Sequence, residues 1–274
     1  MTFLLLFVAA FVGGALNSVA GGGSFIALPA LMSAGVAPVA ANATSTLALW
    51  PGSASSALAY RREVMTMRSW LTGLGLASLV GGLAGGWLLI RTSDERFLQL
   101  LPWLMLAAAV TFTFGGQVTA RLRATSARRS VTAAPSHPAP PPTRTAPRTP
   151  APPHLRTIVP PWLLGFQFVI ATYGGYFGGG MGIMMLAALA VAGLDDIHEM
   201  NGIKTTLAVL INGVALVAFV VSGVIAWKPG LIMVAGGILG GYGGAALARR
   251  LNPSRVRTFV VAIAWIMTAY FFYR

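Results

Sequence analysis

A cluster of three consecutive glycines occurs twice in the chain, at residues 21–23 and 178–180, each time between two apolar segments. A glycine inside an apolar helix costs about 1 kcal/mol relative to alanine, so three in succession predict a break in the helix. Lipid cannot satisfy the N–H and C=O groups that such a break exposes, so protein or a polar cavity must lie beside it. Two breaks at matching positions of two halves are typical of a transporter binding site near the membrane midplane.

The composition places the chain in a membrane. Hydrophobic residues make up 56% of the 274 residues and charged residues 9%, whereas about 25% of a soluble domain is charged. Several apolar runs, such as Trp70 to Ile90, reach the roughly 20 residues that span a bilayer. The absence of cysteine excludes disulfides and thiolate metal sites.

The net charge of +13 does not indicate nucleic-acid binding. Seven of the 19 basic residues lie in a Pro-rich segment at residues 121–157, and most others lie at the ends of apolar runs, where positive residues mark the cytoplasmic side. Anionic lipid headgroups attract each basic residue beside a membrane helix by about 1 kcal/mol. We therefore expect lipid headgroups as partners, and no nucleic acid.

The glycine clusters belong to a repeat that covers most of the chain. Gly22 aligns with Gly180 and, after one extra residue in the second copy, Asn42 aligns with Asn201, 159 positions later. Residues 1–20 have an internal counterpart and no basic start. We interpret them as a retained membrane segment rather than a cleaved signal peptide.

The repeat predicts an all-α polytopic membrane protein. The first membrane repeat is residues 1–120, the linker is 121–157 and the second membrane repeat is 158–274. Each repeat is expected to contain a re-entrant hairpin, broken at the glycines, followed by three transmembrane helices. The predicted segments are 2–19, 24–34, 40–60, 70–90 and 97–120, then 158–177, 183–192, 198–221, 230–248 and 254–273.

The two repeats are expected to insert in opposite orientations. A hairpin that returns to its own side does not cross the membrane, so each repeat crosses it three times. With an odd number of crossings, the second repeat starts on the opposite side from the first. Positive charges give an independent test, since inversion places the arginines at 249–257 on the same side as the arginine-rich linker. The linker is rich in Pro, Ala, Thr and Arg without apolar periodicity, so we expect it to be cytoplasmic and disordered or polyproline-like.

Polar residues cluster at the start of the helix that follows each hairpin. Asn42, Ser45 and Thr46 share a helix face, and so do Asn201, Lys204 and Thr205 in the second repeat. Lys204 is followed by an apolar run and aligns with Ser45. It is interpreted either as part of a binding site or as a lysine that reaches the interface or pairs with Glu199.

The glycine breaks are expected to expose helix starts. A short helix follows each break, so its unpaired N–H groups and positive dipole end face the break, an arrangement that binds anions. Alternatively, the glycines serve only tight hairpin packing. The predicted substrate-binding residues are Gly22, Gly23, Ser24, Asn42, Ser45, Thr46, Gly180, Met181, Gly182, Asn201, Lys204 and Thr205.

No enzyme signature and no cofactor site is predicted. The three histidines have no metal-ligand spacing, and no phosphate-binding loop of the form G-x-x-x-x-G-K-[ST] occurs, which argues against ATP-driven transport by this chain alone. The acidic cluster of Asp195, Asp196 and Glu199 beside His198 is interpreted as a solvated loop or as a proton-coupling group. Coupling to a proton or another cation remains open.

At these residues the chain resembles the TauE/SafE family of sulfite and organosulfonate exporters. The resemblance rests on residues 13–25, Pro29, residues 40–46, the second glycine break at 178–182 and residues 201–206. It implies a bacterial inner-membrane permease for small sulfur-containing or carboxylate anions. The long Pro/Arg linker is a departure from the family pattern.

We therefore expect a secondary transporter, and more specifically an exporter, that carries a sulfur oxyanion such as sulfite or an organosulfonate by alternating access. One alternative keeps the class and changes the direction or substrate, with uptake of thiosulfate or a small carboxylate. Another is a membrane scaffold that recruits a cytoplasmic partner through the basic linker.

Overall fold

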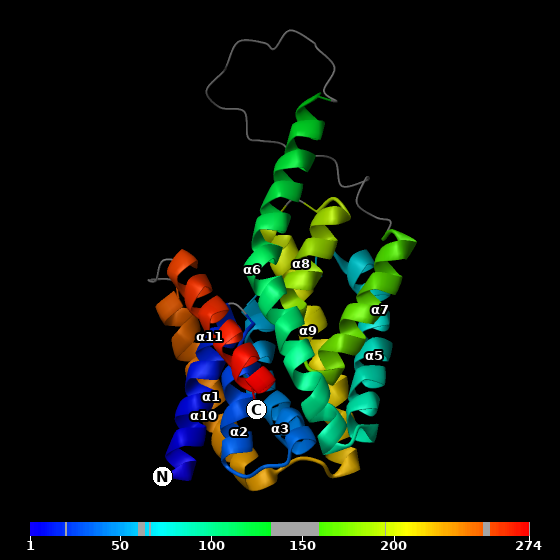
Figure 1. Ribbon diagram of the computed structural model, residues 1–274. Helices are drawn as coiled ribbons and strands as arrows, with labels where there is room; N and C mark the ends of the chain where they lie inside the picture. The colour runs from blue at the N-terminus through cyan, green and yellow to red at the C-terminus, as the bar shows by residue number, and fades with distance from the viewer. Residues whose placement is uncertain are drawn as a thin grey trace.

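The computed structural model describes residues 1–19, 21–59, 64–65, 67–132, 159–194, 196–248 and 253–273, and these residues form helices and connecting loops (Figure 1). The helices are α1 (Thr2–Val19), α2 (Ser24–Ser33), α3 (Pro38–Ala59), α5 (Arg68–Arg91), α6 (Asp94–Thr132), α7 (Pro161–Tyr176), α8 (Met181–Val191), α9 (Ile197–Ser222), α10 (Trp227–Ala248) and α11 (Pro253–Tyr273).

Most helices begin and end close to the predicted bounds. α1 has the predicted bounds, and both glycine clusters separate two helices. Three helices, α3, α7 and α11, begin at a proline. Proline suits a first helical position because its φ is already helical and because the N–H that it lacks would have no partner there.

The end of α6 corrects one prediction. The helix continues to Thr132 and so includes the first twelve residues of the segment predicted to be a disordered linker, which starts at Arg121. Extending an existing helix adds a hydrogen bond per residue without a new nucleus, and this stretch is rich in the helix formers alanine and arginine. The rest of the linker, residues 133–157, lies outside the described residues.

The two short helices end in the same way. Gly35 follows α2 with φ of +86°, and Gly193 follows α8 with φ of +89°. The N–H of Val36 donates to the carbonyl of Leu31 at 3.1 Å, and the N–H of Leu194 donates to that of Leu189 at 3.1 Å. Both ends are therefore Schellman caps at aligned positions of the two repeats, where glycine adopts the left-handed conformation easily.

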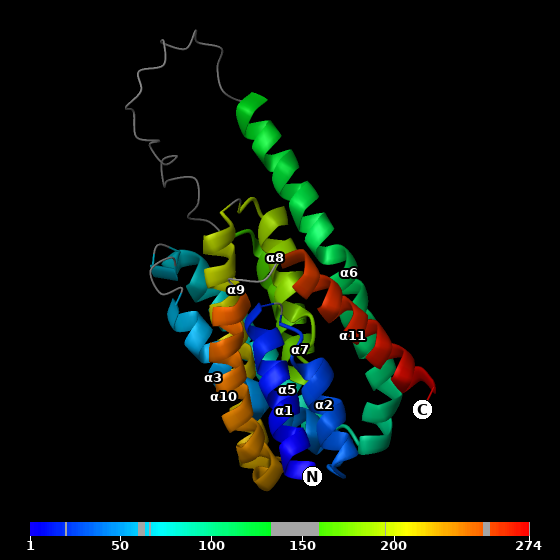
Figure 2. The same ribbon diagram turned by 90° about the vertical axis from the view of Figure 1, so that its left-hand side faces the viewer.

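The two helical hairpins open toward opposite ends of the bundle. Figures 1 and 2 show the N-terminus and the α2–α3 loop at one end, and the start of α7 and the α8–α9 loop at the other. α3 and α9 consequently run in opposite directions.

Each hairpin packs mainly on a helix from the other repeat. α1 lies along α10, and α7 lies along α5, so the two pairings are equivalent under the repeat. Glycines allow the close approach: a Cβ at Gly240 would collide with the carbonyl oxygen of Phe11, and a Cβ at Gly85 with that of Thr172. Small residues at crossings are typical of helix packing in membranes.

The first helices after the hairpins, α3 and α9, cross near aligned residues. The indole Nε1 of Trp50 donates to the carbonyl of Val209 at 3.1 Å. Trp50 and Val209 are 159 positions apart and therefore occupy the same place in the two repeats. Trp50 in α3 and Val209 in α9 therefore lie at about the same level of the bundle.

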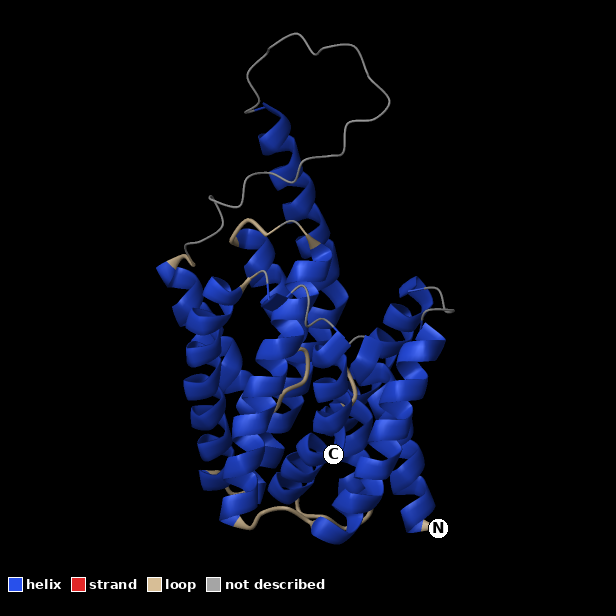
Figure 3. Cartoon of the chain, turned by 180° about the vertical axis from the view of Figure 1, so that it is seen from behind, coloured by secondary structure: helices blue, strands red, loops and turns tan. Residues whose placement is uncertain are grey.

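The outer surface is apolar, as expected for a membrane protein. Three helical segments in the described part of the chain are long and apolar enough to span a bilayer, at Arg68–Arg91, Asp94–Gln117 and Ile197–Ser222. Large side chains such as Trp103 and Val217 are each 62% exposed. Figure 3 shows the helical bundle from behind.

Candidate functional site

The second glycine break separates α7 from α8 and needs glycine at two of its positions. α7 ends at Tyr176 and α8 begins at Met181. Gly178 has φ of +84° and Gly180 has φ of +80°, in the left-handed region that other residues rarely adopt. A Cβ at Gly180 would also lie 3.2 Å from the Cα of Ala108 in α6. The break is thus fixed by backbone conformation and by packing.

Lys204 lies against this break. A Cβ at Gly182, in the first turn of α8, would lie 3.3 Å from Cδ of Lys204, so the aliphatic stem of the lysine packs over the glycine. The side chain is partly buried. Within the described part of the chain its ammonium has no hydrogen bond or ion pair, so the predicted alternative of a pair with Glu199 is not found there.

The start of α8 adds a second source of positive potential beside Lys204. The N–H groups of Ile183 and Met184 both point to the carbonyl of Gly180, at 3.1 and 3.4 Å. The N–H groups of Met181 and Gly182 come before these bonds, where a helix leaves its first donors unpaired. The positive end of the helix dipole and the lysine side chain therefore meet at one point.

A polar face of α9 continues from Lys204 toward the crossing. Asn201, Thr205 and Asn212 lie at helical spacing with Lys204 and are partly buried. These side chains make no hydrogen bond to any described residue. Oδ1 of Asn212 lies 3.8 Å from the position of a Cβ at Gly178. This face of α9 therefore lies near the start of the break through Asn212 and near its end through Lys204. Asn212 was not among the predicted site residues.

Tyr173 fixes the break to α6. Its hydroxyl oxygen lies 2.7 Å from the carbonyl of Gly179 and 3.3 Å from the carbonyl of Leu104. Met181, a predicted site residue, is buried, and its sulfur would collide with a side chain at Gly174. Met181 thus contributes packing and a backbone N–H. Tyr173 was missed because its partners are main-chain carbonyls, which carry no sequence signal.

The first glycine break has an apolar environment. A Cβ at Gly22 would lie 2.8 Å from the side chain of Val260 and 3.6 Å from the ring of Phe112. Phe112 in turn packs edge to face on Phe25, with ring centroids 5.8 Å apart. Such an environment favours the alternative interpretation, in which the glycines serve tight packing.

Gly23 and Ser24 complete the first break. Gly23 lies so close to Gly13 that a side chain at Gly23 would collide with the Gly13 carbonyl. Ser24 begins α2 and is partly buried. The two breaks therefore differ in chemistry, although both abut the same part of α6, at Phe112 and Ala108.

The polar residues of the first repeat are largely satisfied within the protein. The hydroxyls of Ser45 and Thr46 donate to the carbonyl of Asn42 at 2.8 and 3.2 Å. Nδ2 of Asn42 donates to the carbonyl of Tyr176, at the end of α7, at 2.8 Å. Oδ1 of Asn42 is buried and has no partner within the described residues. Near the first break, Nδ2 of Asn17 donates to Oγ of Ser53 at 2.9 Å.

The aligned residues Ser45 and Lys204 lie apart along the bundle. Ser45 and Lys204 each lie five residues before the crossing of Trp50 and Val209. Because α3 and α9 are antiparallel, a rise of about 1.5 Å per residue separates Ser45 from Lys204 by roughly 15 Å along the helix axes. Asn42, in contrast, reaches the C-terminal end of α7 next to the second break, through its bond to the carbonyl of Tyr176. Lys204 likewise lies at the second break.

One member of the acidic cluster before α9, Asp196, has a structural role. The carboxylate of Asp196 accepts hydrogen bonds from the N–H groups of His198 and Glu199, at 2.7 and 3.2 Å, and so caps α9. Asp195 lies outside the described residues. Among described residues, no group of three or more His, Cys, Asp or Glu side chains is arranged to hold a metal ion.

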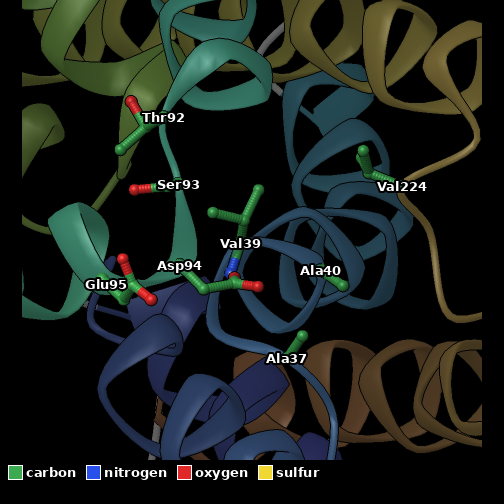
Figure 4. A pocket seen from close by; sticks show the side chains of 8 residues that line it. All are labelled: Ala37, Val39, Ala40, Thr92, Ser93, Asp94, Glu95 and Val224. Atoms are coloured by element: carbon green, nitrogen blue, oxygen red, sulfur yellow. The ribbon is translucent and has the colours of Figure 1, made fainter.

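A pocket of about 490 Å³ lies at the end of the bundle that carries the N-terminus (Figure 4). The loops before α3, α6 and α10 form its walls, and no sequence pattern predicted this pocket. Oδ1 of Asp94 accepts a hydrogen bond from the N–H of Val39 at 2.8 Å and so caps α3 from another helix. The residues that line the pocket are Ala37, Val39, Ala40, Thr92, Ser93, Asp94, Glu95 and Val224.

Comparison with known proteins identifies the family. The family described as Sulfite exporter TauE/SafE matches residues 6–271. A probable membrane transporter protein of Haemophilus influenzae is 29% identical over 269 residues, which cover 97% of this chain and 92% of that protein. The probable membrane transporter protein YfcA of Escherichia coli is 25% identical over 270 residues, which cover 98% and 89%. No solved structure matches the chain. Since the family match extends over nearly the whole sequence, the protein belongs to the TauE/SafE family.

Proposed function

We propose that the protein is a secondary transporter that binds a small oxyanion at the second glycine break and exports it across the bacterial inner membrane. The family and the two relatives support a membrane transporter. The observation that carries the site is the contact between Lys204 and Gly182. This support comes from the stem of Lys204, which packs on the first turn of α8, and from its ammonium, which has no ion pair within the described residues.

The geometry of this break suits a compact anion with several acceptor oxygens. Backbone N–H groups of α8, the ammonium of Lys204 and the amide and hydroxyl donors of Asn201 and Thr205 are all hydrogen-bond donors. A sulfite or sulfonate group has oxygens on several sides and accepts from such a set. Asn212 would extend the site toward a larger substrate, such as an organosulfonate with an attached chain.

Alternating access follows if the repeats insert with opposite orientation. The hairpins open toward opposite ends of the bundle, and each packs on a helix of the other repeat. We infer that the two hairpins rock against α5 and α10 and expose the second break to each side in turn. The arginine-rich segment after α6 would then lie on the cytoplasmic side, against anionic lipid headgroups.

Direction and substrate are tested by flux in proteoliposomes. Vesicles loaded with sulfite, sulfoacetate, taurine, thiosulfate or acetate should release sulfite or a sulfonate faster when the protein is present. Lys204→Ala should abolish that flux, whereas Lys228→Ala, at an exposed lysine in the first turn of α10, should leave it unchanged. Flux of thiosulfate or acetate alone would favour the alternative substrates. Equal flux from the wild type and from Lys204→Ala would contradict the proposed site.

A further inference from the structure

The unpaired amide oxygen of Asn42 points to a second ligand. The side chain is 1% exposed, and its Nδ2 donates to the carbonyl of Tyr176. This bond fixes the orientation of the amide, because a flipped amide would place two oxygens against each other. Oδ1 is left buried and without a partner within the described residues. A buried acceptor without a donor is rare in native proteins and indicates a missing donor or cation.

The surroundings of this oxygen favour a positive ligand. Tyr176 is the last residue of α7, so the negative end of that helix dipole lies beside Asn42. Ser45 and Thr46 donate their hydrogens to the Asn42 carbonyl, which leaves lone pairs on both hydroxyl oxygens one turn along α3. Broken helix ends and unwound carbonyls of this kind coordinate cations in transporters.

The pocket at the end of the bundle lies near Asn42. Val39 lines this pocket, and Asn42 lies three residues further along α3, a rise of about 4.5 Å. Thr92, another lining residue, lies 3.3 Å from the hydroxyl of Tyr176. The pocket presents the carboxylates of Asp94 and Glu95 and no basic side chain (Figure 4). These carboxylates would attract a cation into the pocket.

We propose that Oδ1 of Asn42, together with the carbonyl end of α7, forms a binding site for a monovalent cation, Na⁺, that enters through the acidic pocket. The ligands are neutral oxygens, which suits a monovalent ion better than the divalent ions that recruit carboxylates. An amide does not titrate, so the site serves a metal cation rather than a proton. The inference rests on the proposed function, in which Na⁺ would be the coupling ion.

The test is binding of ²²Na⁺ to the purified protein in detergent without any anionic substrate. The wild type should bind ²²Na⁺ saturably, and unlabelled Na⁺ but not choline should displace it. Asn42→Leu should lose this binding. Gln167→Leu is the matched control, because Gln167 is also a buried amide, 2% exposed, that bonds Ser78, and it lies nine residues before Tyr176, roughly 13 Å along α7. The control should bind Na⁺ as the wild type does.

Two results would overturn the cation site. The first is a wild type without saturable binding, in which case a buried water satisfies Asn42. The second is an Asn42→Leu variant that binds as the wild type does. If Asn42→Leu does not fold, the melting temperature of the wild type decides: it should rise in NaCl relative to equal choline chloride, and an unchanged value contradicts the site. Lys204→Ala should still bind ²²Na⁺, so a failed anion site and a failed cation site give different results.

Discussion

The aliphatic stem of Lys204 in α9 lies over Gly182 in the first turn of α8, 3.3 Å from where a Cβ of residue 182 would stand. The contact joins the second break to a lysine that has no ion pair within the described residues. The aligned residue of the first repeat, Ser45, differs from Lys204, because its hydroxyl donates to the carbonyl of Asn42 in its own helix. The account of anion transport depends on this contact.

A larger residue at position 182 should impair transport. Leucine there would displace the Lys204 stem from the start of α8. Loss of a hydrogen bond to a charged group is worth about 1.5–3 kcal/mol, so anion affinity should fall roughly ten- to hundredfold. Flux at low substrate concentration measures this change. Gly165→Leu is the control, because a Cβ at Gly165 meets nothing within 4 Å. Equal affinities of the two variants would argue against the contact.

Alanine at Gly180 should destabilise the fold more than alanine at Gly193. Both glycines have positive φ, which costs other residues about 1–2 kcal/mol. Only at Gly180 would the new Cβ also press on the backbone of Ala108, at 3.2 Å. Overpacking of that kind adds about 1–3 kcal/mol. Melting temperatures in detergent should therefore fall further for Gly180→Ala, and the opposite order would contradict the packing of the break on α6.

Alanine at Gly240 should weaken the contact between the repeats, whereas alanine at Gly243 should not. Both glycines lie in α10. A Cβ at Gly240 would collide with the carbonyl of Phe11 in α1, whereas a Cβ at Gly243 meets nothing within 4 Å. We expect Gly240→Ala to lower the free energy of unfolding by about 1–3 kcal/mol. Thermal unfolding in detergent measures it, and two variants of equal stability would refute the close α1–α10 approach.

Removal of the Tyr173 hydroxyl should loosen the second break. Tyr173→Phe loses the hydrogen bond to the carbonyl of Gly179, worth about 0.5–1.5 kcal/mol. Hydrogen exchange at the amides of residues 178–182 should therefore become faster. Tyr242→Phe, at a tyrosine that is 82% exposed, provides the control and should leave exchange unchanged. Unaltered exchange in Tyr173→Phe would show that other contacts hold the break.

Much of the helical arrangement follows from the sequence. Glycine clusters and apolar run lengths predict the helices, because these signals act within short stretches of chain, and the 159-residue offset between Asn42 and Asn201 shows that the pattern occurs twice. The extension of α6 past Arg121 was missed, because composition suggested disorder while helix propagation from a long membrane segment prevailed.

The chemistry of each break could not be predicted in the same way. Both clusters look alike in sequence, yet Val260 and Phe112 surround Gly22 while Lys204 lies against Gly182. Which side chains reach a break depends on tertiary packing between helices that are far apart in sequence. The partner of Asn42 is likewise a main-chain carbonyl, that of Tyr176, which no residue pattern reveals.

The most direct test of the central claim is the binding of sulfite to the purified protein, measured by thermal stability in detergent. A ligand at about 100 times its Kd stabilises the folded state by about 2.7 kcal/mol, which raises the melting temperature. The account predicts that sulfite or an organosulfonate raises the melting temperature of the wild type and of Lys228→Ala, but not of Lys204→Ala. A shift of equal size in Lys204→Ala would contradict an anion site at the second glycine break.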